Sequence, residues 1–391
     1  MKSFAIVIIG YNRLPGLKRL VESLEKVDFD NRHDIHLIFS IDNSGKKEVE
    51  NYANDYNWPF GEKHVRTFPE RQGLKKHILS CGDFTQKYDI VALLEDDLFV
   101  SDSFYHYAYQ AADFYFDDDN IAGISLYGFQ KNWLNWVLRF EPQKSDYDSY
   151  FLKVAQSWGQ VWTNRKWSQF KEWYNAHSDF TKSDTIPEYL NTWPESSWLK
   201  YHDRYCIETN KYFVYPYVSI STNFSDSGEH SSQTSTDHQV ELMYGKKEYK
   251  FPDFSSSSIQ YDEYMNRIGL GQYLEIPEDE LCVDFWGTKP KSQYKRYLLS
   301  LESKDYQVIK EFALSLRPIE LSVMLGIQGK GIFLYDTNQT SKAKKYDGEY
   351  QRYLYSIRSR ESGKIFPFAI KLRIKDVWTR GINKIRKKLH K

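Results

Sequence analysis

The stretch that decides the fold runs from Asp89 to Asp97 and reads DIVALLEDD. Its five apolar residues, Ile90–Leu94, are unbroken, which is typical of a strand buried on both faces of a parallel sheet. Three carboxylates follow at the carboxyl end of this strand, where open α/β sheets bind their ligands. Adjacent carboxylates repel one another, and a divalent cation that bridges them to a phosphate relieves the repulsion. The alternative is a strand that ends in a solvated acidic turn.

Apolar segments with strand and helix patterns alternate along the first third of the chain. Expected strands are 4–9, 35–41, 64–68, 90–94 and 121–127, and expected helices are 14–27, 46–56, 72–81 and 104–114. This alternation predicts an α/β fold with a doubly wound, Rossmann-like sheet that is mostly parallel and flanked by helices. No Gly-x-Gly-x-x-Gly follows the first strand and no Gly-Lys-Ser/Thr loop occurs, so neither a dinucleotide fold nor a P-loop is expected.

The composition narrows the class of protein. The 391 residues include 53 Lys and Arg against 53 Asp and Glu, so no global charge favours nucleic acid. Aromatic residues make up 17%, which suits sugar binding, although most of these rings are expected in the core. Three widely spaced cysteines fit neither a disulfide framework nor a zinc site, which favours a reducing, cytoplasmic compartment. The N-terminus is interpreted as a first strand rather than a signal peptide, and no apolar run reaches the ~18 residues of a membrane span.

Polar side chains follow the other predicted strands. Asn12 and Arg13 come after the first strand, Asp42 after the second and Arg71 after the third. An acid such as Asp42 commonly bonds a base or ribose, and the arginines could face a diphosphate. The alternative is that these residues form turns and surface charges.

The pattern changes after residue 130, where tryptophans crowd long polar stretches. Ser157–Gln160 places a small turn residue beside a large ring, which suits a loop around a donor-sugar or acceptor pocket and equally suits a core tryptophan beside a tight turn. A helix is expected to start at 194–197, and an aromatic strand follows at 212–220. The polar loop at 223–230 could close over phosphates.

In this order the motifs resemble those of the GT-A glycosyltransferases, most closely N-acetylglucosaminyltransferase I and its bacterial relatives. The resemblance covers residues 4–235 and rests on Tyr11–Arg13, Ile41–Asp42, Leu94–Asp97, Trp158–Gly159, Tyr215–Pro216 and Gly228–His230. It implies that Asp97 binds Mn²⁺ or Mg²⁺, which holds the diphosphate of the donor, with Glu95 and Asp96 contacting the nucleotide sugar. Asp42 matches the acid that meets the nucleoside, and Arg13 a donor-site arginine.

The resemblance also implies a catalytic base on the Trp-rich helix that precedes the proline-containing strand. Asp203 is the nearest candidate, although its spacing to Pro216 is shorter than the family pattern, and Glu195 and Asp184 are held in reserve. His230 resembles the histidine of the loop that folds over the diphosphate.

The function expected from these features is that of a metal-dependent, inverting glycosyltransferase. It would move a hexose or N-acetylhexosamine from a nucleotide-diphosphate donor, expected to be UDP-linked, to a glycan or lipid-linked glycan acceptor in polysaccharide biosynthesis. The alternatives are a nucleotidyltransferase that makes an activated sugar and a non-catalytic glycan-binding protein. The first would need a Gly-rich basic loop after the first strand, and the second would not need stacked carboxylates at a strand end.

We expect three parts: a catalytic domain at 1–240, an extension at 241–363, and a basic amphipathic tail helix at 364–391. The extension either helps to complete the acceptor site or forms a small second domain. The tail holds ten Lys and Arg against one acid, with apolar residues at intervals of three or four. That pattern suits the surface of an anionic membrane and predicts a peripheral position on the inner face of the plasma membrane. A tail helix docked on the body of the protein is the alternative.

Overall fold

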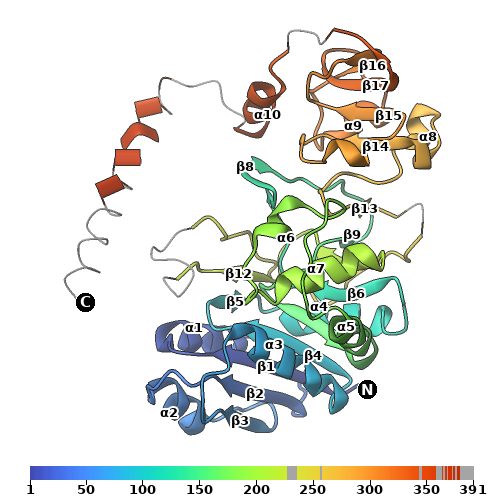
Figure 1. The fold of residues 1–391 in the computed structure, drawn as a ribbon. Coiled ribbons are helices and arrows are strands. Elements are labelled where there is room, and N and C mark those ends of the chain that lie inside the picture. The colour runs from blue at the N-terminus through green and yellow to red at the C-terminus, as the bar shows by residue number, and fades with distance from the viewer. Residues whose placement is uncertain are drawn as a thin grey trace.

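The computed structural model describes residues 1–226, 236–255, 258–342 and 346–357, together with scattered positions between 363 and 378. Two sheets dominate its architecture, a large one in the blue-to-green half of the chain and a small one in the orange part (Figure 1). None of the described helices has both the length and the apolar character needed to cross a membrane.

The larger sheet contains nine strands among the described residues and is mostly parallel. In spatial order they are β13 (Gln260–Tyr261), β9 (Ser149–Leu152), β11 (Tyr212–Pro216), β6 (Ile121–Ser125), β10 (Gln160–Thr163), β4 (Ile90–Glu95), β1 (Phe4–Gly10), β2 (Ile35–Ile41) and β3 (Lys63–Thr67). β1 pairs in parallel with β2 and β4, and β2 pairs in parallel with β3. β10 runs antiparallel to both β4 and β6. The predicted α/β class with a mostly parallel sheet is confirmed.

Helices cover both faces of this sheet. One face carries α1 (Leu14–Leu24), α2 (Glu48–Asp55) and α4 (Phe104–Phe114), and the other carries α3 (Leu74–Gly82), α5 (Asn164–Ala176) and α7 (Leu199–Glu208). In β4, Ile90, Ala92 and Leu94 pack into the first core, and Val91 and Leu93 into the second. Both faces of β4 are therefore buried, as its unbroken apolar run predicts.

Short elements join the strands of the larger sheet and flank its carboxyl edge. β5 (Leu98–Val100) pairs with β12 (Ser221–Asn223), β7 (Lys131–Asn132) pairs with β8 (Asn135–Arg139), η1 (Asp83–Gln86) follows α3, and α6 (Glu188–Thr192) precedes α7. After β12, the amide of Phe224 donates to the carbonyl oxygen of Asp97 at 3.0 Å. This pairing carries the chain after β12 back to the acidic turn.

The chain after β13 builds a second, smaller sheet. Its order is β14 (Leu281–Asp284), β15 (Tyr297–Ser300), β17 (Gly331–Thr340) and β16 (Tyr306–Ala313), accompanied by α8 (Gly271–Leu274), η2 (Glu278–Glu280), η3 (Lys291–Gln293), α9 (Glu320–Met324) and α10 (Gly348–Ile357). Since β13 belongs to the larger sheet, that sheet extends beyond the boundary predicted at residue 240.

The β7–β8 hairpin joins the two parts. Leu138 in β8 is buried in the core of the smaller sheet beside Val283 and Leu299, and burying a leucine contributes about 1.5–3 kcal/mol. Near the same junction, Arg317 Nη1 lies 3.1 Å from Glu141 Oε2. The extension is therefore packed against the part built on the larger sheet through both apolar and charged contacts.

Some predicted boundaries differ from the structure. The strand predicted at 212–220 ends at Pro216 because proline has no N–H to continue the strand pairing. The helix predicted at 14–27 ends at Leu24.

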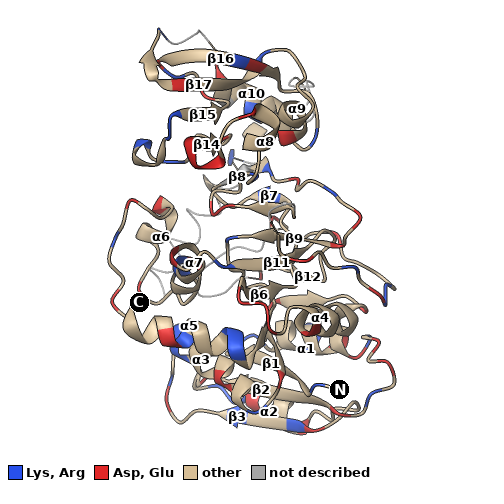
Figure 2. Ribbon diagram, turned by 90° about the vertical axis from the view of Figure 1, so that its right-hand side faces the viewer, with Lys and Arg blue, Asp and Glu red and all other residues tan. Residues whose placement is uncertain are grey.

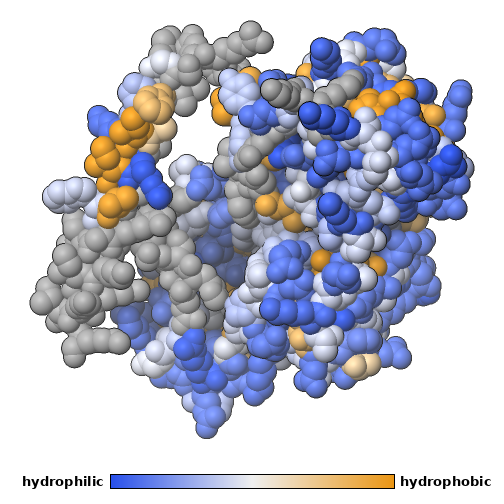
Figure 3. Space-filling model, turned by 45° about the horizontal axis from the view of Figure 1, so that its top comes forward, coloured by the Kyte–Doolittle hydropathy of each residue, from blue (hydrophilic) through white to orange (hydrophobic). Residues whose placement is uncertain are grey.

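Acidic and basic residues are interspersed along both sheets (Figure 2), in line with their equal numbers. The predicted tail helix at 364–391 lies mostly outside the described residues. Among its described positions, Ile370, Ile374, Val377 and Trp378 are exposed. Figure 3 shows hydrophobic residues gathered along the tail, apart from the mostly hydrophilic face of the body.

Candidate active site

The acidic turn lies at the carboxyl edge of the larger sheet, where β4 passes into β5. Ile9 of β1 stands opposite Glu95 of β4, so the residues after β1 lie beside the turn. On the other side α1 approaches closely, because a Cβ added to Gly16 would lie 2.5 Å from the carbonyl oxygen of Asp96. Glycine is therefore needed at position 16, in the first turn of α1, where the helix touches the acidic turn.

Arg13 is the cation that faces the three carboxylates. Its Nη1 donates to Asp97 Oδ2 at 3.0 Å, and its Nη2 forms an ion pair with Asp96. Burial, together with the charge of Asp97, raises the pKa of Glu95 to about 8. Burial likewise raises the pKa of Asp96 to about 6, although Arg13 acts in the opposite direction. One guanidinium therefore does not neutralise the cluster.

The side chain of Asp97 fits a metal ligand. Its Oδ1 is buried and has no hydrogen-bond partner among the described residues. Leaving a buried charged acceptor without a donor is unfavourable, and hard divalent cations bind carboxylate oxygens. The donor set of the acidic turn therefore suits Mn²⁺ or Mg²⁺, and the metal role of Asp97 stays a prediction.

Asp42, at the end of β2, organises the neighbouring loop. Its Oδ1 accepts from the amides of Asn43 and Gln72 at 2.8 and 2.7 Å, and its Oδ2 accepts from the amide of Gly73 at 2.9 Å. Nearby, the guanidinium of Arg71 lies over the ring of Tyr11, 5.1 Å from its centre. Asp42 thus has a structural role in this loop besides the predicted contact with a nucleoside.

These residues share one cleft of about 750 Å³, which is here called the donor cleft. The predicted donor-side and metal residues that line it are Asn12, Arg13, Asp42, Arg71, Glu95, Asp96 and Asp97. They meet because each follows a strand of the larger sheet or a loop at its carboxyl edge.

The opposite wall of the donor cleft is rich in tryptophan. Trp133, Trp158 and the segment Trp193–Leu199, except Glu195, contribute to it. Trp158 precedes Gly159, which has a φ of +96°, and a Cβ there would lie 2.9 Å from the side chain of Leu126. The turn at 157–160 therefore brings Trp158 to the cleft, one of the two outcomes that the sequence left open.

A histidine that the sequence analysis did not select also lines the donor cleft. His238 packs on Trp158, with ring centres 4.5 Å apart, and burial lowers its pKa while the charges of Asp237 and, to a smaller extent, Asp97 act in the opposite direction. The predicted His230 lies outside the described residues. An acid followed by a histidine, Asp237–His238, stands later in the same polar segment, and this pattern could have pointed to His238.

The candidate bases occupy different surroundings. Asp203 is 1% exposed and does not line the donor cleft; its carboxylate accepts from the amide of Ala155 at 2.6 Å and from the hydroxyl of Tyr189 at 3.3 Å. Burial raises its pKa well above the usual range. A general base must reach the proton that it removes, so this geometry argues against the predicted role of Asp203. Glu195 does not line the donor cleft either, but it is exposed and stands between Pro194 and Ser196, which do line it. Asp184 lies before α6 and outside the cleft lining.

The donor side of this cleft corresponds to a known protein family. Residues 5–169 match the family model described as Glycosyl transferase family 2. The match covers less than half of the chain. The matched segment includes the acidic turn and the strands from β1 to β10 in chain order, whereas the Trp193–Leu199 wall lies beyond the matched residues.

Solved structures similar to the chain include proteins with bound nucleotides or nucleotide sugars. The mannosyltransferase PcManGT from Pyrobaculum calidifontis, in complex with GDP-Man and Mn²⁺, is 11% identical with a TM-score of 0.33 over 56% of this chain and 57% of that chain. TarS 1–349 from S. aureus is 16% identical with UDP bound, with a TM-score of 0.35 over 56% of this chain and 60% of that chain. With UDP-GlcNAc bound, TarS 1–349 is 16% identical with a TM-score of 0.37 over 59% of this chain and 60% of that chain. This chain thus spans 57–60% of the length of these proteins. No curated protein matches it.

Proposed function

We propose that this chain is a metal-dependent, inverting glycosyltransferase. It transfers a hexose or N-acetylhexosamine from a nucleotide-diphosphate donor, UDP-linked in this proposal, to a glycan or lipid-linked glycan. The observation that carries the proposal is the donor cleft of the matched segment, where an incompletely neutralised acidic turn faces Arg13 and Asp42.

The donor is held at the carboxyl edge of the sheet. Asp97 would hold the metal ion, since one of its carboxylate oxygens is buried and has no hydrogen-bond partner among the described residues, while Glu95 and Asp96 shape the same end of the site. Mn²⁺, when bound, neutralises the negative charge that develops on the leaving diphosphate. Arg13 and Arg71 bind diphosphate oxygens, a pairing that guanidinium groups favour.

The nucleoside lies at the β2 end of the cleft in this proposal. Asp42 follows β2 and Asn12 follows β1, whereas Asp97 follows β4 on the other side of β1. The donor therefore extends along the strand ends, with its base and ribose beside Asp42 and its diphosphate above the acidic turn. Its sugar then points toward the tryptophan wall beyond β4.

For the base we propose Glu195. Hydrogen bonds from Lys200 Nζ and the Tyr201 hydroxyl, both 2.7 Å, lower the pKa of Glu195 and keep it ionised at neutral pH. Glu195 takes the proton of the acceptor hydroxyl as that oxygen attacks the anomeric carbon, and the bond from this carbon to the diphosphate breaks. Attack opposite the leaving group inverts the configuration. Asp203 positions the surrounding loops through Ala155 and Tyr189.

We also propose that the tail at 364–391 attaches the enzyme to an anionic membrane on the cytoplasmic side. Its ten Lys and Arg against one acid support this, because each basic residue near such a surface can contribute about 1 kcal/mol. Co-sedimentation with phosphatidylserine vesicles should fall when the chain ends at residue 363. Equal binding of both chains would contradict the membrane role.

The central experiment measures thermal stability and nucleotide release with a panel of nucleotide sugars, in Mn²⁺ and in EDTA. One donor should stabilise the protein by ~2.7 kcal/mol at a hundredfold excess over its Kd, and only in Mn²⁺. Slow release of the nucleoside diphosphate should follow. Release of pyrophosphate from a nucleoside triphosphate and a sugar phosphate would instead indicate a nucleotidyltransferase, and binding of glycans alone a lectin-like protein.

A further inference from the structure

A second pocket, which no predicted site residue lines, opens beside the tryptophan wall. It has a volume of about 450 Å³ and is lined by Trp133–Leu134, Pro187–Tyr189, Trp193, Tyr264 and Thr288. We call it the aromatic pocket, because four of these side chains are aromatic rings. Its walls come from the β7–β8 hairpin, the α6 segment and the junction with the smaller sheet. Its size lies within the range of ordinary small-ligand sites.

The aromatic pocket and the donor cleft share a wall. Trp133 and Trp193 line both cavities, and their ring centres lie 5.9 Å apart. Tyr189 packs on Trp193 at 5.1 Å. A molecule that occupies the aromatic pocket is therefore only the thickness of these rings away from the donor cleft.

Strand order assigns the aromatic pocket to one end of the donor cleft. Along the sheet, β2, β1, β4 and β10 follow one another. Asp42 follows β2, the acidic turn follows β4, and Trp158 precedes β10. The aromatic pocket adjoins the tryptophan wall at the β10 end, on the far side of the acidic turn from Asp42. The nucleoside and the occupant of the aromatic pocket are thus at opposite ends.

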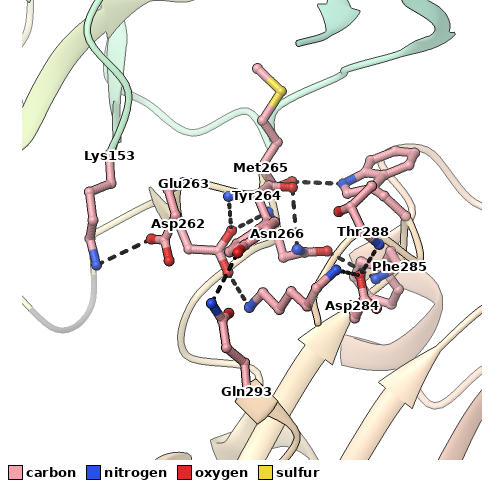
Figure 4. Close-up of polar contacts among 12 residues, drawn as sticks. Lys153, Asp262, Glu263, Tyr264, Met265, Asn266, Asp284, Phe285, Thr288 and Gln293 are labelled. Atoms are coloured by element: carbon pink, nitrogen blue, oxygen red, sulfur yellow. Dashed lines mark hydrogen bonds and ion pairs between the residues drawn. The ribbon is translucent and has the colours of Figure 1, made fainter. Parts of the chain in front are cut away.

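Buried polar contacts hold the rings in place. The hydroxyl of Tyr189 donates to Asp203 Oδ2 at 3.3 Å. The amide of Tyr264 donates to Asp262 Oδ1 at 2.9 Å, and Gln293 Nε2 donates to the Tyr264 hydroxyl at 3.0 Å. Figure 4 shows Asp262, Tyr264 and Gln293 within one network at the junction. The aromatic pocket is thus largely pre-formed.

A lysine also contributes to this hydrogen-bond network at the junction. Lys289 Nζ donates to Asp262 Oδ2 at 2.6 Å, so its charge is used inside the junction and is not directed into the aromatic pocket. Among the described residues that line the aromatic pocket, Glu188 alone is charged. Its exposed carboxylate can accept hydrogen bonds from hydroxyl groups and repels anions. The buried hydroxyl of Thr288 has no hydrogen-bond partner among the described residues.

We propose that the aromatic pocket binds an uncharged sugar ring of the acceptor, next to the ring that receives the transferred sugar. The proposal rests on the glycosyltransferase function proposed above. The apolar C–H face of a pyranose can pack on the rings, while Glu188 and Thr288 bond its hydroxyls. Since Tyr264 and Thr288 belong to the junction with the smaller sheet, the C-terminal extension takes part in choosing the acceptor. Neutral oligosaccharides should bind better than monosaccharides or anionic polymers.

The test is binding of the full-length protein, with Mn²⁺ and UDP, to an array of neutral and acidic glycans of one to five sugars. Wild type should retain neutral glycans of two or more sugars. The double variant Glu188→Gln with Thr288→Val should bind them about tenfold more weakly, as the loss of roughly two hydrogen bonds predicts. Glu172→Gln, an exposed acid on α5, is the matched control and should bind as wild type does.

Three results would overturn the proposal: no glycan retained by wild type, a preference for acidic glycans, or equal binding by the double variant. Thermal melting of each protein, with and without Mn²⁺ and UDP, checks folding and the donor cleft separately. Normal stabilisation by UDP with no retained glycan would refute the aromatic pocket while leaving the proposed donor site intact. If UDP with Mn²⁺ does not stabilise the wild-type protein, that result would count against the proposed function.

Discussion

Replacing Asp97 by asparagine tests the role of the acidic turn most directly. Asp97→Asn keeps the volume of the side chain and removes its charge, so the metal ion loses its proposed ligand. Removing one group that stabilises the charge of a transition state typically lowers kcat about 10²–10³-fold, or ~2.7–4 kcal/mol. We expect at least this loss in Mn²⁺-dependent turnover, together with weaker binding of Mn²⁺.

The stability of Asp97→Asn follows from two opposing effects. The variant loses a charge-assisted hydrogen bond of 3.0 Å from Arg13, although the amide oxygen of asparagine can still accept from the same donor. It also loses the negative charge that helps to raise the pKa of Glu95. We therefore expect the free energy of unfolding to change by no more than about 1 kcal/mol, the size of a typical substitution, and the pKa of Glu95 to fall.

The assay compares nucleotide release from the best donor, Mn²⁺ binding by calorimetry and thermal melting in EDTA. Asp89→Asn is the matched control, since Asp89 flanks the opposite end of β4, where its Oδ2 accepts from the amide and hydroxyl of Ser3 at 2.8 Å. It should retain turnover and Mn²⁺ binding. Near-normal turnover or unchanged Mn²⁺ affinity in Asp97→Asn would refute the metal role, and an unfolded variant would refute the stability argument.

Three further predictions concern the same site. Glu195→Gln should retain donor binding and lose transfer at least about a hundredfold, whereas Asp203→Asn should lower the melting temperature more than it lowers kcat; the reverse pattern would restore Asp203 as the base. Because the folded protein raises the pKa of Glu95 from 4.5 to about 8, this group's stabilising effect is fully present below pH 4.5 and is lost as the pH rises through about 8. The metal-free protein should therefore become less stable as the pH rises over that interval. Its affinity for Mn²⁺ should increase over the same interval, since the cation competes with protons. Thermal melting and calorimetry across pH 5–8 measure the two trends, and the absence of either would contradict the prediction. Gly16→Ala should displace the backbone of the acidic turn, because its Cβ would lie 2.5 Å from the Asp96 carbonyl oxygen, and should reduce turnover well beyond the exposed α1 control Glu22→Ala; equal turnover in the two variants would contradict this packing.

The sequence alone predicted the sheet, and it selected polar side chains that meet in one cleft. The unbroken apolar run of β4 is a local pattern typical of a strand covered on both faces, and the structure covers it on both faces. Arg13, Asp42 and Asp97 each follow a strand or a short turn after it. Because neighbouring parallel strands end at the same edge, these side chains converge whatever lies elsewhere in the chain.

The proposed acceptor side depended on the tertiary structure. Asp203 and Glu195 both lie near the tryptophan-rich helix in sequence, yet packing of α7 buries Asp203 against Ala155 while the turn before it leaves Glu195 exposed. The aromatic pocket joins Trp193 to Thr288 across the two sheets. The hydrophobic repeat of a strand, two residues, or of a helix, 3.6 residues, does not predict such contacts, because they depend on how separate elements pack together. Local patterning therefore determined the strands and their polar ends, and docking of the extension decided which distant side chains complete the site.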